Sequence, residues 1–279
     1  MIYQKLTIND IQQNEQLFKI WTLVCQAHKG QKRKGTVRGV HPDYTSHLFK
    51  VMEIMANVLG NPKNVLQDKK FLPLLAIALT HDIIEDTAID SKEKLAGVLE
   101  PILGAVGAKN VAFVVGELSN PKQGFLGNTK QEQDIVKKIW QINHVKEISV
   151  FAKMVKMADQ IANIVDCVDI NMTIIDKQGH KRELWTDEKK KFYAVKALSV
   201  CRAALIGVQN ISDKERLVFK NLMDLADAAY DYGVLKIKSP LVEQMDFYDT
   251  LHLHFQQVDL FNKKTLLSYC VKNNCAKIM

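Results

Sequence analysis

One ten-residue stretch places a histidine among carboxylates in what reads as a helix. In ALTHDIIEDT (78–87), His81 and Asp82 are adjacent, and Glu85 and Asp86 follow one helical turn later. Residues four apart on a helix are neighbours, so His81 pairs with Glu85, and Asp82 pairs with Asp86, on one face. An imidazole beside a carboxylate is a mixed nitrogen and oxygen ligand set that suits Mn²⁺, Fe²⁺, Zn²⁺ or Mg²⁺.

The neighbours of this stretch favour a buried metal site over a charged surface stripe. Large aliphatic residues flank the ionisable ones on both sides, namely Leu74, Leu75, Ile77, Ile83 and Ile84. Burying four ionisable groups among them is costly unless a cation compensates. We therefore expect all four to be buried beside a divalent ion, with a solvent-facing stripe as the alternative.

Two residues hold a divalent ion poorly, and two other segments offer further ligands. His47 opens an amphipathic helix, and His41 lies in the loop before it. Asp159 and Asn163 lie one turn apart in AKMVKMADQIANI (152–164), which is otherwise almost entirely apolar apart from two lysines and a glutamine. These residues by themselves leave the choice between the two histidines open.

The elements that must position these residues are helices. Apolar residues recur at helical spacing almost throughout the 279 residues, and strand-like alternation is rare. The segment TIIDKQGHKREL (173–184) is either a short hairpin or an ordered loop. We predict an all-α fold, with a helical bundle over residues 1–205 and a helical C-terminal extension, residues 206–279, packed on it.

The composition is typical of a soluble globular protein, with 47% hydrophobic and 25% charged residues. The sequence contains neither a stretch of eighteen uncharged apolar residues nor the layout of a signal peptide, so we expect a cytoplasmic protein without a membrane span. Its five cysteines are scattered and lack CxxC spacing, which favours reduced thiols.

The net charge of +7 is unevenly distributed. HKGQKRKGTVR (28–38) holds five basic residues and no acidic one. Three interpretations of this run are open: a solvated loop, a surface that binds nucleic acid, or part of a pocket for a phosphorylated small molecule. No aromatic residue alternates with the cations, which weakens the interpretation as a single-strand-binding surface.

Four segments, in order, resemble the hydrolase domain of RelA/SpoT-type alarmone enzymes, which are HD-domain metal-dependent phosphohydrolases. The similarity spans about residues 20–205, and a bare HD dipeptide would be weak support without the other segments. The four segments are AHKGQKRK with YTSH, ALTHDIIEDT, VKMADQIANI and ELWTDEKKKFYAVKAL.

The resemblance implies an HD-domain helical bundle and a metal, typically Mn²⁺, although other divalent ions fit the same ligand types. It selects His47 over His41, because the family's ligand histidine lies three residues after a tyrosine, here Tyr44. Glu85 and Asp86 would orient a water molecule and handle protons. The implied metal ligands are His47, His81, Asp82 and Asp159.

The resemblance also implies the substrate contacts. Arg33 would pack on a nucleotide base and Lys34 would lie near phosphates, while Asn163 and Tyr193 would contact the substrate. Ser119–Asn120 fall where the family has Thr-Asp near the pocket.

The implied reaction is hydrolysis of the 3′-diphosphate of ppGpp or pppGpp to GDP or GTP and pyrophosphate, as in the stringent response. The 74 residues after position 205 are too few for a synthetase domain, so we expect a stand-alone small alarmone hydrolase. The expected partner is a small nucleotide, without membrane or nucleic acid, and a homo-oligomer is left open.

Two departures from the family pattern keep other functions open. Val165 stands where the family commonly has arginine, and the segment after Asn120 carries lysines only. The alternatives are an HD-fold phosphohydrolase acting on another nucleotide, such as an NADPH 2′-phosphatase or a 5′-nucleotidase, and a non-catalytic nucleotide-binding regulator.

Overall fold

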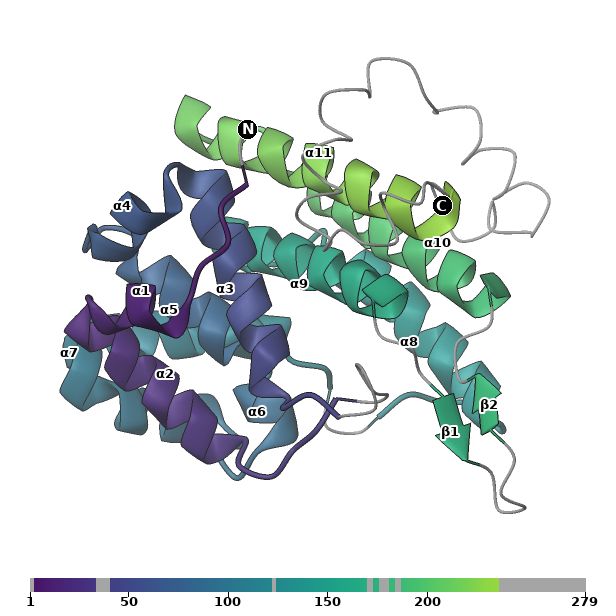
Figure 1. Ribbon diagram of the computed structural model, residues 1–279, viewed down its shortest axis with the longest axis horizontal. Coiled ribbons are helices and arrows are strands. Elements are labelled where there is room, and N and C mark those ends of the chain that lie inside the picture. Colours follow the sequence, from purple (N-terminus) through teal and green to yellow (C-terminus); the bar gives the residue numbers. More distant parts are fainter. Residues whose placement is uncertain are drawn as a thin grey trace.

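The computed structural model describes residues 3–33, 41–121, 124–169, 173–175, 181–183 and 187–235 (Figure 1). Its elements in chain order are α1 (Ile8–Gln12), α2 (Glu15–Ala27), α3 (Thr45–Leu59), α4 (Pro62–Gln67), α5 (Leu72–Thr80), α6 (Ile83–Asp86), α7 (Lys92–Leu118), α8 (Lys130–His144), α9 (Val150–Asp169), β1 (Thr173–Ile175), β2 (Lys181–Glu183), α10 (Asp187–Ala204) and α11 (Asp213–Leu235). The predicted all-α class is confirmed, with one small hairpin added.

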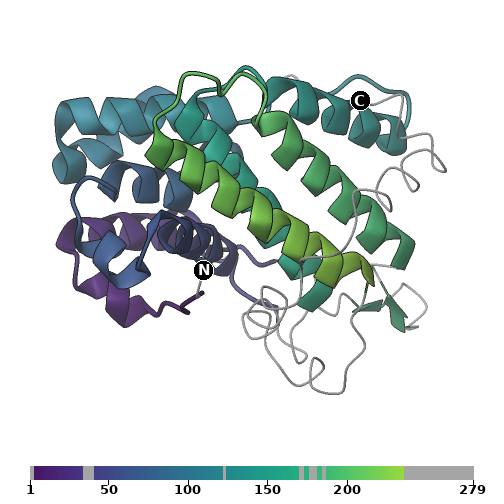
Figure 2. The ribbon, with the colours of Figure 1, turned by 90° about the horizontal axis from the view of Figure 1, so that it is seen from above.

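Helix α9 lies at the centre of the bundle and contacts most of the other long helices. On one side it packs against α3, α5 and α7, and on the other against α10 and α11. Figures 1 and 2, which are views at right angles to each other, both show α10 and α11 running alongside α9. The apolar stripe of α9, from Met154 to Val165, is buried on both sides of its polar residues, so the side chains of Asp159 and Asn163 are surrounded by other helices.

Helix α5 is buried almost all round, which explains its uniformly apolar sequence. Seven of the residues in LPLLAIALT are apolar and buried, and Pro73 occupies the first turn, where its missing amide costs nothing. Contacts with α2, α3 and α7 cover this helix. Its C-terminal end is therefore held in place inside the bundle.

The expected continuous helix through ALTHDIIEDT is wrong. Helix α5 ends at Thr80, His81 and Asp82 form a turn, and the single-turn α6 begins at Ile83. The Asp82 carbonyl accepts the amides of Glu85 and Asp86, and so starts the new turn. The break puts Glu85 and Asp86 on a separate element from the end of α5.

The uncertain segment at 173–184 is a hairpin rather than an irregular loop. Strands β1 and β2 pair antiparallel, with Thr173 opposite Glu183 and Ile175 opposite Lys181. The hairpin joins α9 to α10, the helix that carries Tyr193.

Helix α7 alone, within the described residues, is long and apolar enough to cross a membrane by length and composition. Gly104 interrupts it with a φ of 72°, close after Pro101. Leu95, Leu99 and Val111 are buried, and α7 packs against α5 and α9. Helix α7 is therefore kinked and only partly buried, with 33% of its apolar stretch inside the bundle.

The division at residue 205 remains a prediction. Helix α11, which follows it, packs on α9, α10 and α3, with Leu222 and Leu225 fully buried. Residues 236–279 lie outside the described part of the chain. Of the cysteines, Cys25 and Cys201 are free thiols, and the side chains of the others are not described.

Shortening a buried side chain of α5 should destabilise the protein. Leu75 is 1% exposed, so we expect Leu75→Ala to lower the free energy of unfolding by about 2–5 kcal/mol through lost burial and a residual cavity. Urea denaturation followed by circular dichroism measures this change. Leu126→Ala, at a residue 88% exposed, is the matched control and should change stability by less than about 0.5 kcal/mol. Equal effects would contradict the packing of α5.

Candidate metal centre

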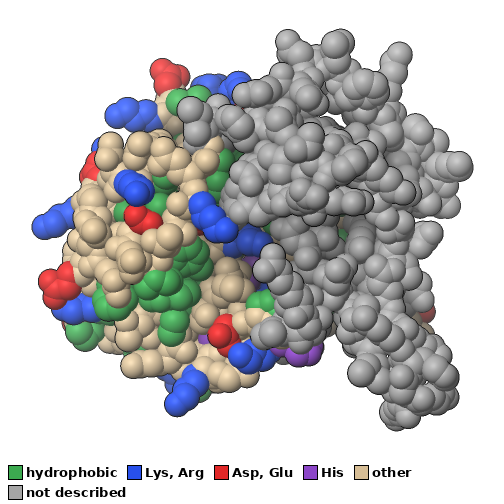
Figure 3. Space-filling view, in the orientation of Figure 1, with side chains coloured by type: hydrophobic (Ala, Val, Ile, Leu, Met, Phe, Trp, Pro, Cys, Tyr) green, Lys and Arg blue, Asp and Glu red, His purple; other side chains and the backbone are tan. Residues whose placement is uncertain are grey.

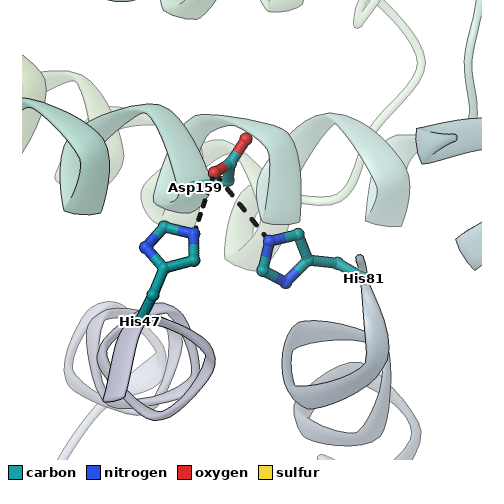
Figure 4. Close-up of side chains that lie close together, drawn as sticks. All are labelled: His47, His81 and Asp159. Carbon is teal, nitrogen blue, oxygen red and sulfur yellow. Dashed lines mark ion pairs between the residues drawn. The ribbon is translucent and has the colours of Figure 1, made fainter. Parts of the chain in front are cut away.

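Three buried side chains from three helices meet beside α9. His47 comes from the first turn of α3, His81 from the end of α5 and Asp159 from the middle of α9. Each offers a ligand atom, and these atoms all lie within 4.8 Å of one another. Figure 4 shows both imidazole rings directed toward the Asp159 carboxylate, whose Oδ1 lies 3.3 Å from His47 Nε2 and 3.8 Å from His81 Nε2.

Asp82 adds a fourth potential ligand at the edge of this cluster. Its Oδ2 lies 3.1 Å from His81 Nε2 and accepts a 2.6 Å hydrogen bond from the Tyr44 hydroxyl. Burial and the negative charge of Asp82 raise the pKa of Tyr44, so this phenol stays protonated and donates. Tyr44 therefore fixes the rotamer of Asp82, while the other oxygen remains for a further partner.

The residues present fit a divalent cation. His81 Nδ1 lies 2.9 Å from the carbonyl oxygen of Ala78, which requires the proton to be on Nδ1. The lone pair of the neutral ring is then on Nε2, which is buried and makes no hydrogen bond within the described part of the chain. A metal-ligating histidine is commonly held in this way, by a carbonyl on its second nitrogen.

The local charge balance also calls for a cation. Burial alone would raise the pKa of Asp159, but Lys156, with Nζ 3.1 Å from Oδ2, and the two histidines hold that pKa well below its usual range. Burial lowers the pKa of His81, yet Asp82 and Asp159 outweigh it and raise the pKa to about 9. The carboxylates therefore draw a positive charge onto the imidazole, a place that a metal ion would take.

Glu85 and Asp86 lie at the rim, so the expected burial of all four ionisable residues is wrong. His81 is buried and Asp82 partly so, whereas Glu85 and Asp86 are exposed because α6 turns away from the core after Asp82. The backbone and side-chain amides of Asn120 donate to the two oxygens of Glu85, at 2.7 and 2.5 Å. Partial desolvation and the charge of Asp82 raise the pKa of Glu85.

The expected substrate residues lie on one side of the histidine and aspartate cluster. Arg33 donates to Asp166 at 2.6 Å and lies 3.3 Å from the amide oxygen of Asn163, whose nitrogen donates to Asp159 at 2.5 Å. Tyr193, on α10, is half-buried and interacts electrostatically with Arg33. Lys34 lies outside the described residues.

Several residues near the centre were not expected from the sequence to contact the ligands. Tyr44 and Lys156 contact the proposed ligands directly, and Asp166 links Arg33 and Lys50, each at 2.6 Å. The sequence spacing could have indicated Asp166, because it lies seven residues after Asp159 and so lies on the same face of the helix.

The basic run does not form a simple cationic surface in its described part. Lys32 pairs with Asp43, and Arg33 pairs with Asp166. On the face drawn in Figure 3, the described Lys and Arg side chains lie in separate places. Two of the described cations of this run, Lys32 and Arg33, are therefore paired with carboxylates.

Several solved structures are similar to this chain. No family model matches this chain, and no curated protein matches it. A metazoan orthologue of SpoT, described as hydrolysing ppGpp and having a role in starvation responses, is similar over 78% of this chain and 96% of its own. The identity is 22% and the TM-score is 0.48.

Metal binding should release a proton from His81. Because the pKa of His81 is raised to about 9, the ring is protonated at pH 7.5 and must lose that proton to become a ligand. We expect about one proton released per Mn²⁺ ion, and an affinity that falls as the pH drops below 9. Calorimetry in two buffers of different ionisation enthalpy counts the protons.

His144→Gln is the control, since it removes a histidine that binds the Glu117 carbonyl instead. This variant should release the same number of protons. A binding enthalpy independent of the buffer would contradict the role of His81.

Proposed function

We propose that this protein is a metal-dependent phosphohydrolase that removes the 3′-diphosphate of ppGpp or pppGpp as pyrophosphate, leaving GDP or GTP. The observation that carries the proposal is the meeting of His47, His81 and Asp159 from three separate helices, with Asp82 beside them. The four ordered sequence segments support the class of substrate.

The metal would be held by His47, His81, Asp82 and Asp159, and Mn²⁺ suits this mixture of nitrogen and oxygen ligands. When bound, such an ion supplies Lewis-acid polarisation of a phosphoryl oxygen and makes water more acidic. Tyr44 and Lys156 keep the two aspartates oriented through their hydrogen bond and ion pair.

Glu85 and Asp86 would handle the protons. In the reaction, a water oxygen bonds to the phosphorus attached to the ribose 3′ oxygen. The bond between this phosphorus and the 3′ oxygen breaks, and the 3′ oxygen takes a proton. Glu85 is held by Asn120 beside Asp82, and a raised pKa makes its carboxylate a stronger acceptor for the proton of the attacking water. Asp86 follows Glu85 on the same turn, close to Tyr44.

The nucleotide would lie on the Arg33 side of the centre. A guanidinium plane suits stacking on a purine, and Tyr193 adds an aromatic side chain from α10. Lys34, by its place in the sequence, would supply a charge for the phosphates. Asn163 bridges Arg33 and Asp159, and so would set the distance between the base and the reacting phosphate.

NADPH is the alternative substrate that the sequence leaves open. Removal of a phosphate from a ribose 2′ position would use the same four ligands. A 5′-nucleotidase activity, a non-catalytic regulatory role, a cytoplasmic location and a homo-oligomer remain predictions.

Purified protein with Mn²⁺ should convert ppGpp to GDP and pyrophosphate, and Asp82→Ala should abolish this turnover because it removes a ligand. Parallel reactions with NADPH and deoxynucleoside monophosphates, analysed by ion-exchange chromatography, identify the substrate. Turnover of NADPH alone would replace ppGpp in the proposal. Mn²⁺ binding without turnover of any of them would favour the regulator.

Glu85→Gln should separate chemistry from metal binding. The amide keeps the shape, and its one oxygen can accept one of the two hydrogen bonds from Asn120. It cannot take a proton, so we expect kcat to fall by about 10²–10⁴-fold. Calorimetric Mn²⁺ affinity should stay close to that of the wild type, because Glu85 is not among the expected ligands. Unchanged kcat would remove Glu85 from the mechanism.

A further inference from the structure

Asp166 is a buried carboxylate that contacts three side chains at once, two of which, Arg33 and His47, are expected site residues. It is 5% exposed and lies on α9, two turns after Asp159. Its Oδ2 accepts from Arg33 at 2.6 Å and lies 3.5 Å from Nδ1 of His47, while its Oδ1 accepts from Lys50 at 2.6 Å. Both cations are themselves mostly buried, so these contacts are shielded from solvent.

These contacts close a ring of side chains around the centre. Starting from Asp159, the ring passes through His47, Asp166, Arg33 and Asn163 and returns to Asp159. Three of the five members, Asp159, Asn163 and Asp166, are spaced by four and three residues and so lie on one face of α9. Two of the expected ligands, His47 and Asp159, and the expected base-binding Arg33 are therefore parts of one network.

We propose that Asp166 is a positioning residue that orients His47 for the metal and holds Arg33 for the nucleotide. The inference rests on the proposed metal site.

The effect on His47 follows from the two nitrogens of its ring. A carboxylate facing Nδ1 favours the tautomer with the proton on that nitrogen, which leaves the lone pair of Nε2 directed at Asp159 and the centre. In the described structure, Nδ1 is buried and has no closer partner. Mutation of a residue that holds a ligating histidine in this way typically weakens metal binding by about 10–100-fold.

The effect on Arg33 is to fix its plane and balance its charge. The guanidinium lies between Asp166 and the ring of Tyr44, with its carbon 5.6 Å from the ring centroid. A side chain already held in place loses less conformational entropy when a ligand binds. With its charge balanced, Arg33 would offer a flat surface to a base, and the phosphates would depend on other cations.

Asp166→Asn tests the inference, because the amide keeps the size but removes the charge that both functions need. We expect the variant to bind Mn²⁺ about 10–100-fold more weakly in calorimetry with the metal alone. With saturating Mn²⁺, we expect KM for ppGpp to rise while kcat changes less, since Glu85 and Asp86 are untouched. A thermal melt in the absence of metal reports whether the variant is folded.

Glu53→Gln is the matched control. Glu53 is also a buried carboxylate, on the same helix as His47, but it accepts from the amide of Leu6 on the other side of α3. This variant should keep wild-type Mn²⁺ affinity and KM. Equal losses in both variants would mean that Asp166 acts only through general stability, and would overturn the inference.

The two proposals fail in different ways. Wild-type Mn²⁺ affinity in a folded Asp166→Asn variant would overturn the role of Asp166 and leave the metal site standing. A wild-type protein that binds no Mn²⁺ would overturn the proposed function, and the inference with it. Asp166→Ala removes the hydrogen bonds of this side chain as well as its charge. Wild-type Mn²⁺ affinity in a folded Asp166→Ala variant would likewise overturn the inference.

Discussion

The whole arrangement depends on keeping carboxylates ionised inside an apolar bundle. Asp159 and Asp166 are each 5% exposed and lie on a helix surrounded by aliphatic side chains. A charge in such a place is tolerated only if opposite charges and hydrogen bonds surround it. Lys156, Arg33, Lys50 and the two histidines meet that need, and a divalent ion would complete it. Helices α3, α5 and α9 each bring one residue to the shared centre.

The bundle meets this requirement by giving the site rigid supports. Helix α5 is enclosed by α2, α3 and α7, and α9 is enclosed by α3, α10 and α11, so His81 and Asp159 project from elements that have little room to move. The residues that would do the chemistry, Glu85 and Asp86, lie instead on a short exposed turn. The proposed metal ligands thus lie in the core, and the residues proposed to handle protons lie at the rim, where solvent can reach them.

The sequence predicted those features that depend on the spacing of residues within one segment. Helical spacing predicted the amphipathic helix behind His47 and the turn between Asp159 and Asn163, and both are present as α3 and α9. The break at His81 was not predictable in this way, since neither glycine nor proline marks it. The partners of Asp166 were also out of reach, because Arg33 lies 133 residues away and only the packing of α9 brings the two together. Local periodicity predicts which faces are buried, whereas long-range packing decides which polar groups meet.

The end of helix α5 has a consequence of its own. Every helix leaves its last four carbonyl groups without amide partners further along the helix, and a buried end must find other donors for them. At Ala78 the donor is the imidazole of His81, so the hydrogen bond that caps the helix also places a proton on Nδ1 of a proposed metal ligand. A sequence that extended α5 smoothly through this region would gain regular helix and lose this orientation of the histidine.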